Sequence, residues 1–117
     1  PGVRYNWIIA KDVLEHIEYV DRTISALKNC CYGIIAVVPL SKFIGARYVI
    51  EDYEKDVTHK QRLPLLVWVN FFVSPEWRVE CAYRLPGVKD NYYKPGWEYG
   101  NGFIVARRIR DDRDFHL

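Results

Sequence analysis

The amino-acid sequence predicts an α/β fold: a partial doubly wound sheet of about four strands with two or three helices. Two short apolar runs, at 7–10 and 34–38, suit strands that are covered on both faces. A helical apolar stripe lies between them. An alternating segment at 77–85 and an apolar run at 103–106 suit an antiparallel hairpin at the sheet edge. We therefore expect the first two strands to be parallel and the last two to be antiparallel.

The first unit is a strand at 6–10, a sharp turn, and a helix from about 13 to 28. Asp12 and Glu15 have the spacing of a capping box, in which a carboxylate accepts from the first amides and Glu15 reaches back. A break at Asp21, which could cap a second helix, is an open alternative. The apolar residues recur at intervals of four and three, which predicts one buried stripe: Val13, Ile17, Val20, Ile24 and Leu27.

The second strand is predicted at 32–38, and its connection to the first implies a right-handed parallel crossover. A long mixed connection follows at 40–62, and loops of this length are usually functional or disordered. Residues 63–72 are apolar almost throughout and fit either a helix or a strand. We expect a helix because Pro64 suits a first turn, although the β-branched and aromatic content favours a strand.

The pattern near the end of the chain predicts a one-sided strand at 77–85, which forms the first arm of a long hairpin over 77–108. A loop rich in Gly and Pro joins it to the last strand at 103–106. The charged tail at 109–117 is expected to fray. Nothing in the sequence divides the chain, so residues 1–117 are read as a single domain.

The composition of the chain limits the kinds of partner that it can be expected to bind. The chain has 117 residues, 50% hydrophobic, which is enough for one small core, and its net charge of +2 argues against nucleic acid. Its apolar runs are too short to span a membrane, and no signal peptide is visible. Cys30, Cys31 and Cys81 lack a disulfide framework, which predicts reduced thiols in the cytoplasm. The three histidines lack zinc-ligand spacing, so no metal site is predicted.

Three segments carry a resemblance to a known family. They are Asp-Val-Leu-Glu-His-Ile at 12–17, the strand end Val-Val-Pro-Leu at 37–40, and Asp-Val-Thr-His at 56–59. In this order and spacing they resemble the second half of a class I, Rossmann-like S-adenosylmethionine-dependent methyltransferase, over about residues 5–108. The family's first half, with its Gly-rich loop and ribose-binding acidic residue, is absent. The chain also begins at Pro1 and contains no Met, so we expect a fragment of a longer domain, with a processed start as the open alternative.

The resemblance carries implications for fold and ligand. It implies that the four strands are neighbours in the spatial order first, second, fourth, third. It implies S-adenosylmethionine as the cofactor, with Ala10, Lys11 and Asp12 beside its methionine end. It also implies that the loop at 56–59 faces the methyl acceptor.

His59, Asp56 and His16 are the candidate catalytic residues. The i, i+3 spacing of Asp56 and His59 lets a carboxylate orient an imidazole, as a general base or a weak metal site requires. Simpler alternatives stay open: His16 packs beside the apolar stripe, or Asp56 caps a turn while His59 faces solvent. Another simple alternative is that Asp12 is a plain helix cap. An aromatic group in the Gly/Pro loop either closes over an acceptor or packs as a small satellite core: Tyr92, Tyr93, Trp97 and Tyr99.

These observations lead to an expected function. We expect part of a methyltransferase that is inactive as this chain alone, because the Gly-rich cradle is missing. A non-catalytic α/β interaction module is the alternative, and in either case the apolar strand edge at Trp7–Ala10 predicts a homodimer. A third interpretation is a small hydrolase that uses Asp56 and His59, with or without a metal ion.

Overall fold

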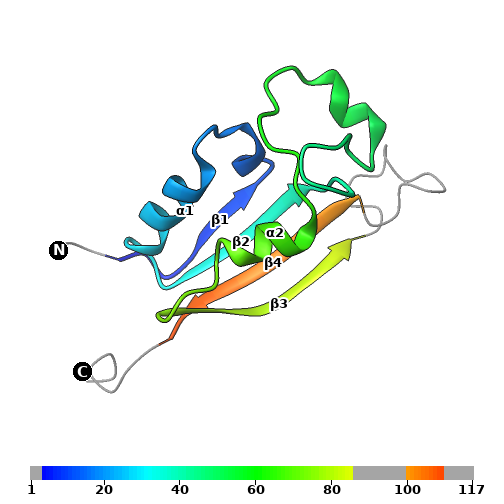
Figure 1. Cartoon of the computed structure of the whole chain (residues 1–117). Coiled ribbons are helices and arrows are strands. Elements are labelled where there is room, and N and C mark those ends of the chain that lie inside the picture. The colour runs from blue at the N-terminus through cyan, green and yellow to red at the C-terminus, as the bar shows by residue number, and fades with distance from the viewer. Residues whose placement is uncertain (1–3, 86–99, 110–117) are drawn as a thin grey trace, which may run out of the picture.

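A four-stranded mixed sheet forms the centre of the protein in a computed structural model, which describes residues 4–85 and 100–109. Its strands lie in the order β1-β2-β4-β3 (Figure 1), as the resemblance implied. β1 pairs parallel to β2, and β4 is antiparallel to both β2 and β3. The predicted α/β class and hairpin are therefore confirmed. The strand bounds are Ile8–Lys11, Gly33–Pro39, Trp77–Leu85 and Asn101–Arg108 for β1 to β4.

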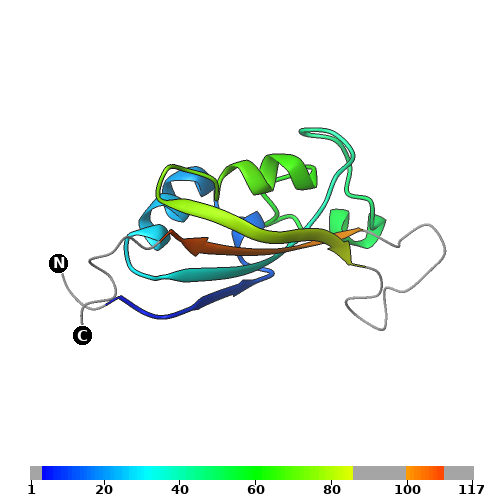
Figure 2. The ribbon, with the colours of Figure 1, turned by 90° about the horizontal axis from the view of Figure 1, so that it is seen from below.

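Two α-helices, α1 (Val20–Lys28) and α2 (Leu65–Asn70), lie on the same face of the sheet (Figure 2). The helix predicted over 63–72 is present but shorter, and Pro64 is its N-cap and not part of its first turn. Burying large apolar side chains between helix and sheet contributes about 1.5–3 kcal/mol each to stability. The fully buried members of this core come from both layers: Ile24, Trp68 and Phe72 from the helical layer, and Ile34, Val38 and Ile104 from the sheet.

The predicted capping box after the first strand is wrong. Asp12 adopts a φ of 57°, a left-handed conformation that Asp tolerates better than most residues. A single 3-10 turn, η1 (Leu14–His16), follows, with Val13 at the N-cap and no side-chain cap hydrogen bond. Glu15 is buried, with 2% of its surface exposed, and its carboxylate lies 3.6 Å from Nε2 of His16. The left-handed turn thus replaces the start of a long helix.

The helix predicted from about 13 to 28 is shorter, because Ile17 is extended and interrupts it. The helix α1 begins after Tyr19, so Asp21 lies inside its first turn and does not cap it. Val13, expected on the buried stripe, is 48% exposed. The other four stripe residues do pack on the core, two of them fully buried: Ile17, Val20, Ile24 and Leu27.

The one-sided strand predicted at 77–85 changes face within its length. A register shift between Val79 and Cys81 marks a bulge, and after it Ala82 pairs with the buried Ile104. Cys81 is consequently exposed, as is Tyr83. The expected alternation therefore holds only as far as the bulge.

The strand β1 is an edge of the sheet, since β2 is its only neighbour among the described strands. Ile9 lies between Ile8 and Ala10, which face the core, so its side chain points to the other face of the sheet, and it is 70% exposed. Neither helix of the described part is long and apolar enough to cross a bilayer. The aromatic group at 92–99 and the tail at 110–117 lie outside the described residues.

Candidate functional site

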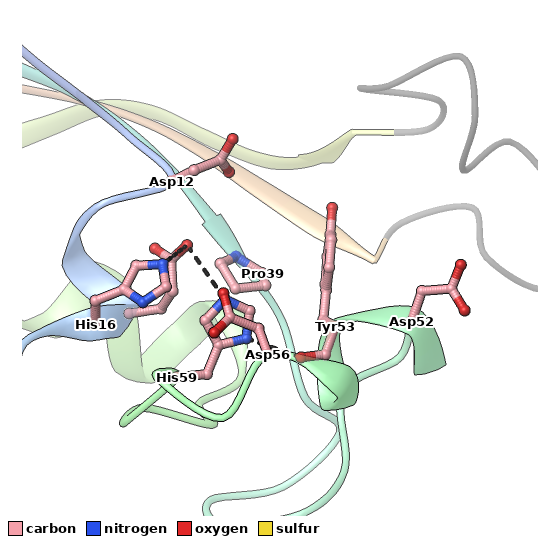
Figure 3. Close-up of a pocket in the computed structure, with 8 residues that line it drawn as sticks. Asp12, His16, Pro39, Asp52, Tyr53, Asp56 and His59 are labelled. Carbon is pink, nitrogen blue, oxygen red and sulfur yellow. Dashed lines mark hydrogen bonds and ion pairs between the residues drawn. The ribbon is translucent and has the colours of Figure 1, made fainter.

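A polar pocket of about 200 Å³ lies beyond the carboxyl ends of the parallel strands β1 and β2. Ligands of open α/β sheets bind at this end of the strands. Figure 3 shows the side chains that surround the pocket, drawn from three separate parts of the chain. The lining residues are Asp12, Glu15, His16, Pro39, Asp52, Tyr53, Asp56 and His59.

Backbone hydrogen bonds hold the loop after η2 (Glu51–Lys55) against the turn after β1. The carbonyl oxygen of Glu15 accepts from the amides of Lys60 at 2.7 Å and Gln61 at 3.0 Å. The Gln61 side-chain amide donates in turn to the carbonyls of Ile17 and Glu18, at 2.8 and 2.9 Å. These bonds place residues 56–59 beside His16 although the two segments are far apart in the sequence.

An ion pair braces the 48–62 loop, the larger segment that contains η2 and the residues on both sides of it. Arg62 donates from Nη2 to Glu54 Oε1 at 2.8 Å, and Glu54 Oε2 accepts from the amide of Tyr48 at 2.7 Å. The hydrogen bond from Arg62 holds the pKa of Glu54 below its usual value. Burial raises the pKa of Tyr48 to about 12, and its hydroxyl donates to the Gln61 carbonyl. Tyr53 joins the loop to the start of β4 by donating to Asn101 Oδ1 at 3.0 Å.

Asp56 and Thr58 form a polar turn that reaches His16. The Asp56 carboxylate accepts from both the amide and the hydroxyl of Thr58, and these bonds lower the pKa of Asp56. Since the hydroxyl proton of Thr58 goes to Asp56, its oxygen accepts from His16 Nδ1 at 2.9 Å. The Thr58 carbonyl lies 3.3 Å from the same nitrogen. Nδ1 of His16 therefore carries the proton, and Nε2 has a lone pair when the ring is neutral.

His59 is fixed in the same tautomer from the opposite side. Its Nδ1 donates to the Tyr53 carbonyl at 2.9 Å, so its Nε2 also has a lone pair when neutral. Its side chain is only 7% exposed, and burial lowers its pKa below the usual value. The expected alternative of a solvent-exposed His59 is therefore wrong. Asp56 does make a local turn, and its Oδ2 also lies 3.5 Å from His59 Nε2.

Both Nε2 atoms face the buried carboxylate of Glu15. Oε2 of Glu15 lies 3.6 Å from His16 Nε2 and 3.9 Å from His59 Nε2 (Figure 3). One ligand atom from each of the three residues lies within 4.8 Å of the others. This grouping supplies two things chemically: a base with a lone pair, and a set of atoms of the kind that bind a metal ion.

The predicted catalytic residues His16, Asp56 and His59 all line one pocket, together with Asp12 from the predicted cofactor group. The other two members of that group do not line it. Ala10 is buried in the sheet core, and Lys11 is exposed at the end of β1.

Sequence reasoning assigned Glu15 to a cap and so missed its place in the site. Tyr53 and Asp52 were also missed as lining residues. The signal that could have pointed to Glu15 is its position next to His16, an acidic residue and a histidine directly after a buried strand.

No protein-family model matches this chain, and none of the curated proteins does.

Proposed function

We propose that the chain is the second half of an S-adenosylmethionine-dependent methyltransferase domain, with its acceptor site at the polar pocket. The observation that carries the proposal is the meeting of two segments at one pocket. The turn after β1 contributes Asp12, and the loop after η2 contributes Asp56 and His59. The resemblance puts the donor at the first segment and the acceptor at the second, and methyl transfer requires them to be adjacent.

The chemistry is alignment with assistance from a base. S-adenosylmethionine, when bound, supplies a sulfonium methyl group that an acceptor oxygen, nitrogen or carbon attacks, and the carbon–sulfur electrons return to sulfur. Nε2 of His59 is suited to accept the proton that the acceptor loses, because Tyr53 holds the ring in that tautomer. Its lowered pKa keeps Nε2 unprotonated near neutral pH. His16, in the same tautomer, is the second candidate base.

The residues present fit this donor only in part. A pocket of about 200 Å³ is smaller than the roughly 300–1,000 Å³ typical of sites that enclose a whole ligand. It suits the methionine end of the donor and not its nucleoside. We therefore propose weak binding and no turnover by this chain unless another polypeptide supplies the nucleoside site.

Nuclear magnetic resonance titration of the ¹⁵N-labelled chain tests this proposal. Millimolar S-adenosylhomocysteine should shift the backbone amides of residues 10–12, whereas adenosine alone should not, because only the former carries the amino-acid end. Shifts confined to other residues, or none at all, would contradict the proposal. A micromolar dissociation constant for S-adenosylmethionine, measured by calorimetry, would show instead that this chain binds the cofactor without the missing half.

A second proposal is assembly of two copies through the edge strand. It is supported by the place of β1 at the sheet edge and by the exposed Ile9. Edge strands offer unpaired backbone groups to another strand, and apolar side chains beside them favour burial. A cytoplasmic location stays a prediction, which rests on the sequence pattern of Cys30, Cys31 and Cys81.

A further inference from the structure

We propose that Glu15, His16 and His59 form a binding site for one divalent transition-metal ion, with Zn²⁺ the best match. The site would use Glu15 Oε2 and the Nε2 atoms of both histidines. This departs from the sequence-based expectation of no metal site. It does not depend on methyl transfer, since it concerns binding of an ion to this chain.

The first argument is the direction of the lone pairs. Both Nδ1 atoms donate to oxygen acceptors, Thr58 for His16 and Tyr53 for His59. Both Nε2 atoms therefore keep their lone pairs on the side where the carboxylate of Glu15 lies, and His59 Nε2 also has Asp56 Oδ2 at 3.5 Å. The three atoms are thus arranged as the ligands of a cation would be, with the side chains of Glu15 and His59 almost fully buried and that of His16 32% exposed.

A metal-binding histidine characteristically donates its other ring N–H to a backbone carbonyl or another oxygen acceptor. Both histidines meet this condition here, from different parts of the chain. The Thr58 hydroxyl is itself fixed by its hydrogen bond to Asp56, so two successive hydrogen bonds hold His16 in place.

A proton shared between histidine and Glu15 is the competing explanation. The distances of 3.6 and 3.9 Å are too long for hydrogen bonds, which have donor–acceptor distances of about 2.7–3.2 Å. Zinc bonds of about 2.0–2.1 Å in a tetrahedral site put ligand atoms about 3.4 Å apart. Small side-chain rotations would therefore bring these three residues to an ion.

The donor set selects the kind of ion. Two imidazoles with one carboxylate suit Zn²⁺ and its transition-metal neighbours, whereas Mg²⁺ and Ca²⁺ prefer oxygen ligands. Three protein ligands leave a fourth position, and the group borders the pocket that Asp12 and Asp56 also line. That position would take water or an oxygen ligand of a substrate. An ion bound here occupies Nε2 of His59, so metal binding and proton transfer by His59 exclude each other.

Calorimetric titration of the metal-free chain with Zn²⁺ tests the site. One ion per chain should bind, and Mg²⁺ should not compete with it. Glu15→Gln and His59→Gln should each lower the affinity at least about 100-fold, more than the loss of a supporting group usually does. Two matched controls should keep the affinity: His116→Gln, which changes the third histidine, and Cys30→Ser, which removes a thiol that could bind Zn²⁺.

A measurement on the unmodified chain covers the case in which a variant fails to fold. Zn²⁺ should move the ¹⁵N resonances of Nε2 in His16 and His59, while both Nδ1 atoms keep their protons. No saturable binding by the folded chain would overturn the proposal. So would affinity that is lost in Cys30→Ser or His116→Gln and kept in Glu15→Gln. The amide shifts of residues 10–12 report binding of S-adenosylhomocysteine, whereas the histidine shifts report binding of the ion. Each of the two proposals can therefore fail without the other.

Discussion

The imidazole rings of His16 and His59 lie 4.6 Å apart, centre to centre, and each is held through Nδ1 by an oxygen of a different loop residue. Neither ring can turn its Nε2 away from the shared carboxylate without losing that bond. The pair therefore depends on the fold of the 48–62 loop, and changes in that loop should alter the site without touching either histidine.

Thr58→Val gives the most direct test of this dependence. The substitution removes the hydroxyl that accepts from His16 and donates to Asp56, at an exposed position where folding should tolerate it. Loss of such a supporting group should lower Zn²⁺ affinity by about 10–100-fold. Calorimetry measures the affinity.

Thr58→Ser is the matched control, because it keeps the hydroxyl and should retain the affinity. A further readout separates positioning from a general loss of structure. In Thr58→Val the carboxyl of Asp56 loses a hydrogen bond, so its pKa should rise toward the ordinary value in a ¹³C titration. Unchanged affinity in Thr58→Val would show that His16 is not held through this residue.

Glu54→Gln should lower the stability of the protein near neutral pH and have little effect in acid. Arg62 lowers the pKa of Glu54 in the folded state, so the unfolded chain binds its proton first as the pH falls. The stabilisation is thus fully present above the ordinary pKa of 4.5 and is lost as the pH falls below it. At pH 7 the substitution should cost about 1 kcal/mol, as expected for a partly exposed charged pair.

Urea unfolding at several pH values measures this effect. The difference between the unmodified chain and Glu54→Gln should be greatest near neutrality and shrink below pH 4.5. Glu51→Gln, in the same 3-10 helix and exposed, is the control and should change little. A difference that stayed constant with pH would mean that the ion pair with Arg62 does not stabilise the fold.

Tyr48→Phe should reduce the loss of folding stability that occurs at alkaline pH. The pKa of Tyr48 is about 12 when folded against 10.0 ordinarily, so the unfolded state loses its proton first as the pH rises. Stability should therefore fall between about pH 10 and 12, and less steeply in Tyr48→Phe. The variant loses the hydrogen bond to Gln61 and should be less stable at pH 8 by about 1 kcal/mol. Equal slopes in the two proteins would contradict this account.

Much of the sheet could be predicted from local patterns, because buried parallel strands are continuous apolar runs. The strand β2 illustrates this, as does α2, where Pro64 decided between helix and strand. The bulge in β3 was not visible, since the sequence alternates without interruption through Glu80. The capping box failed because Asp12 takes a left-handed conformation that no neighbouring residue signals.

The sequence predicted Asp12, His16, Asp56 and His59 among the residues that line the site, but not how they are arranged. Spacing along the chain brought Asp56 and His59 together as candidates and left His16 as a separate one. The bonds from Lys60 and Gln61 to the Glu15 carbonyl, which unite the two segments, are tertiary contacts with no sequence pattern. The capping-box pattern consequently misplaces Glu15, whose carboxylate lies near Nε2 of both histidines.

Ile9→Lys should disrupt the proposed dimer. Ile9 lies on the edge strand with 70% of its surface exposed, and a lysine there places a charge where a second copy would pack. Leu66→Lys is the matched control, because Leu66 is equally exposed but lies on α2. In sedimentation at micromolar concentration, the unmodified chain and Leu66→Lys should be dimers and Ile9→Lys a monomer. A monomeric unmodified chain would show that there is no dimer. A dimer that Leu66→Lys breaks and Ile9→Lys does not would place the interface elsewhere.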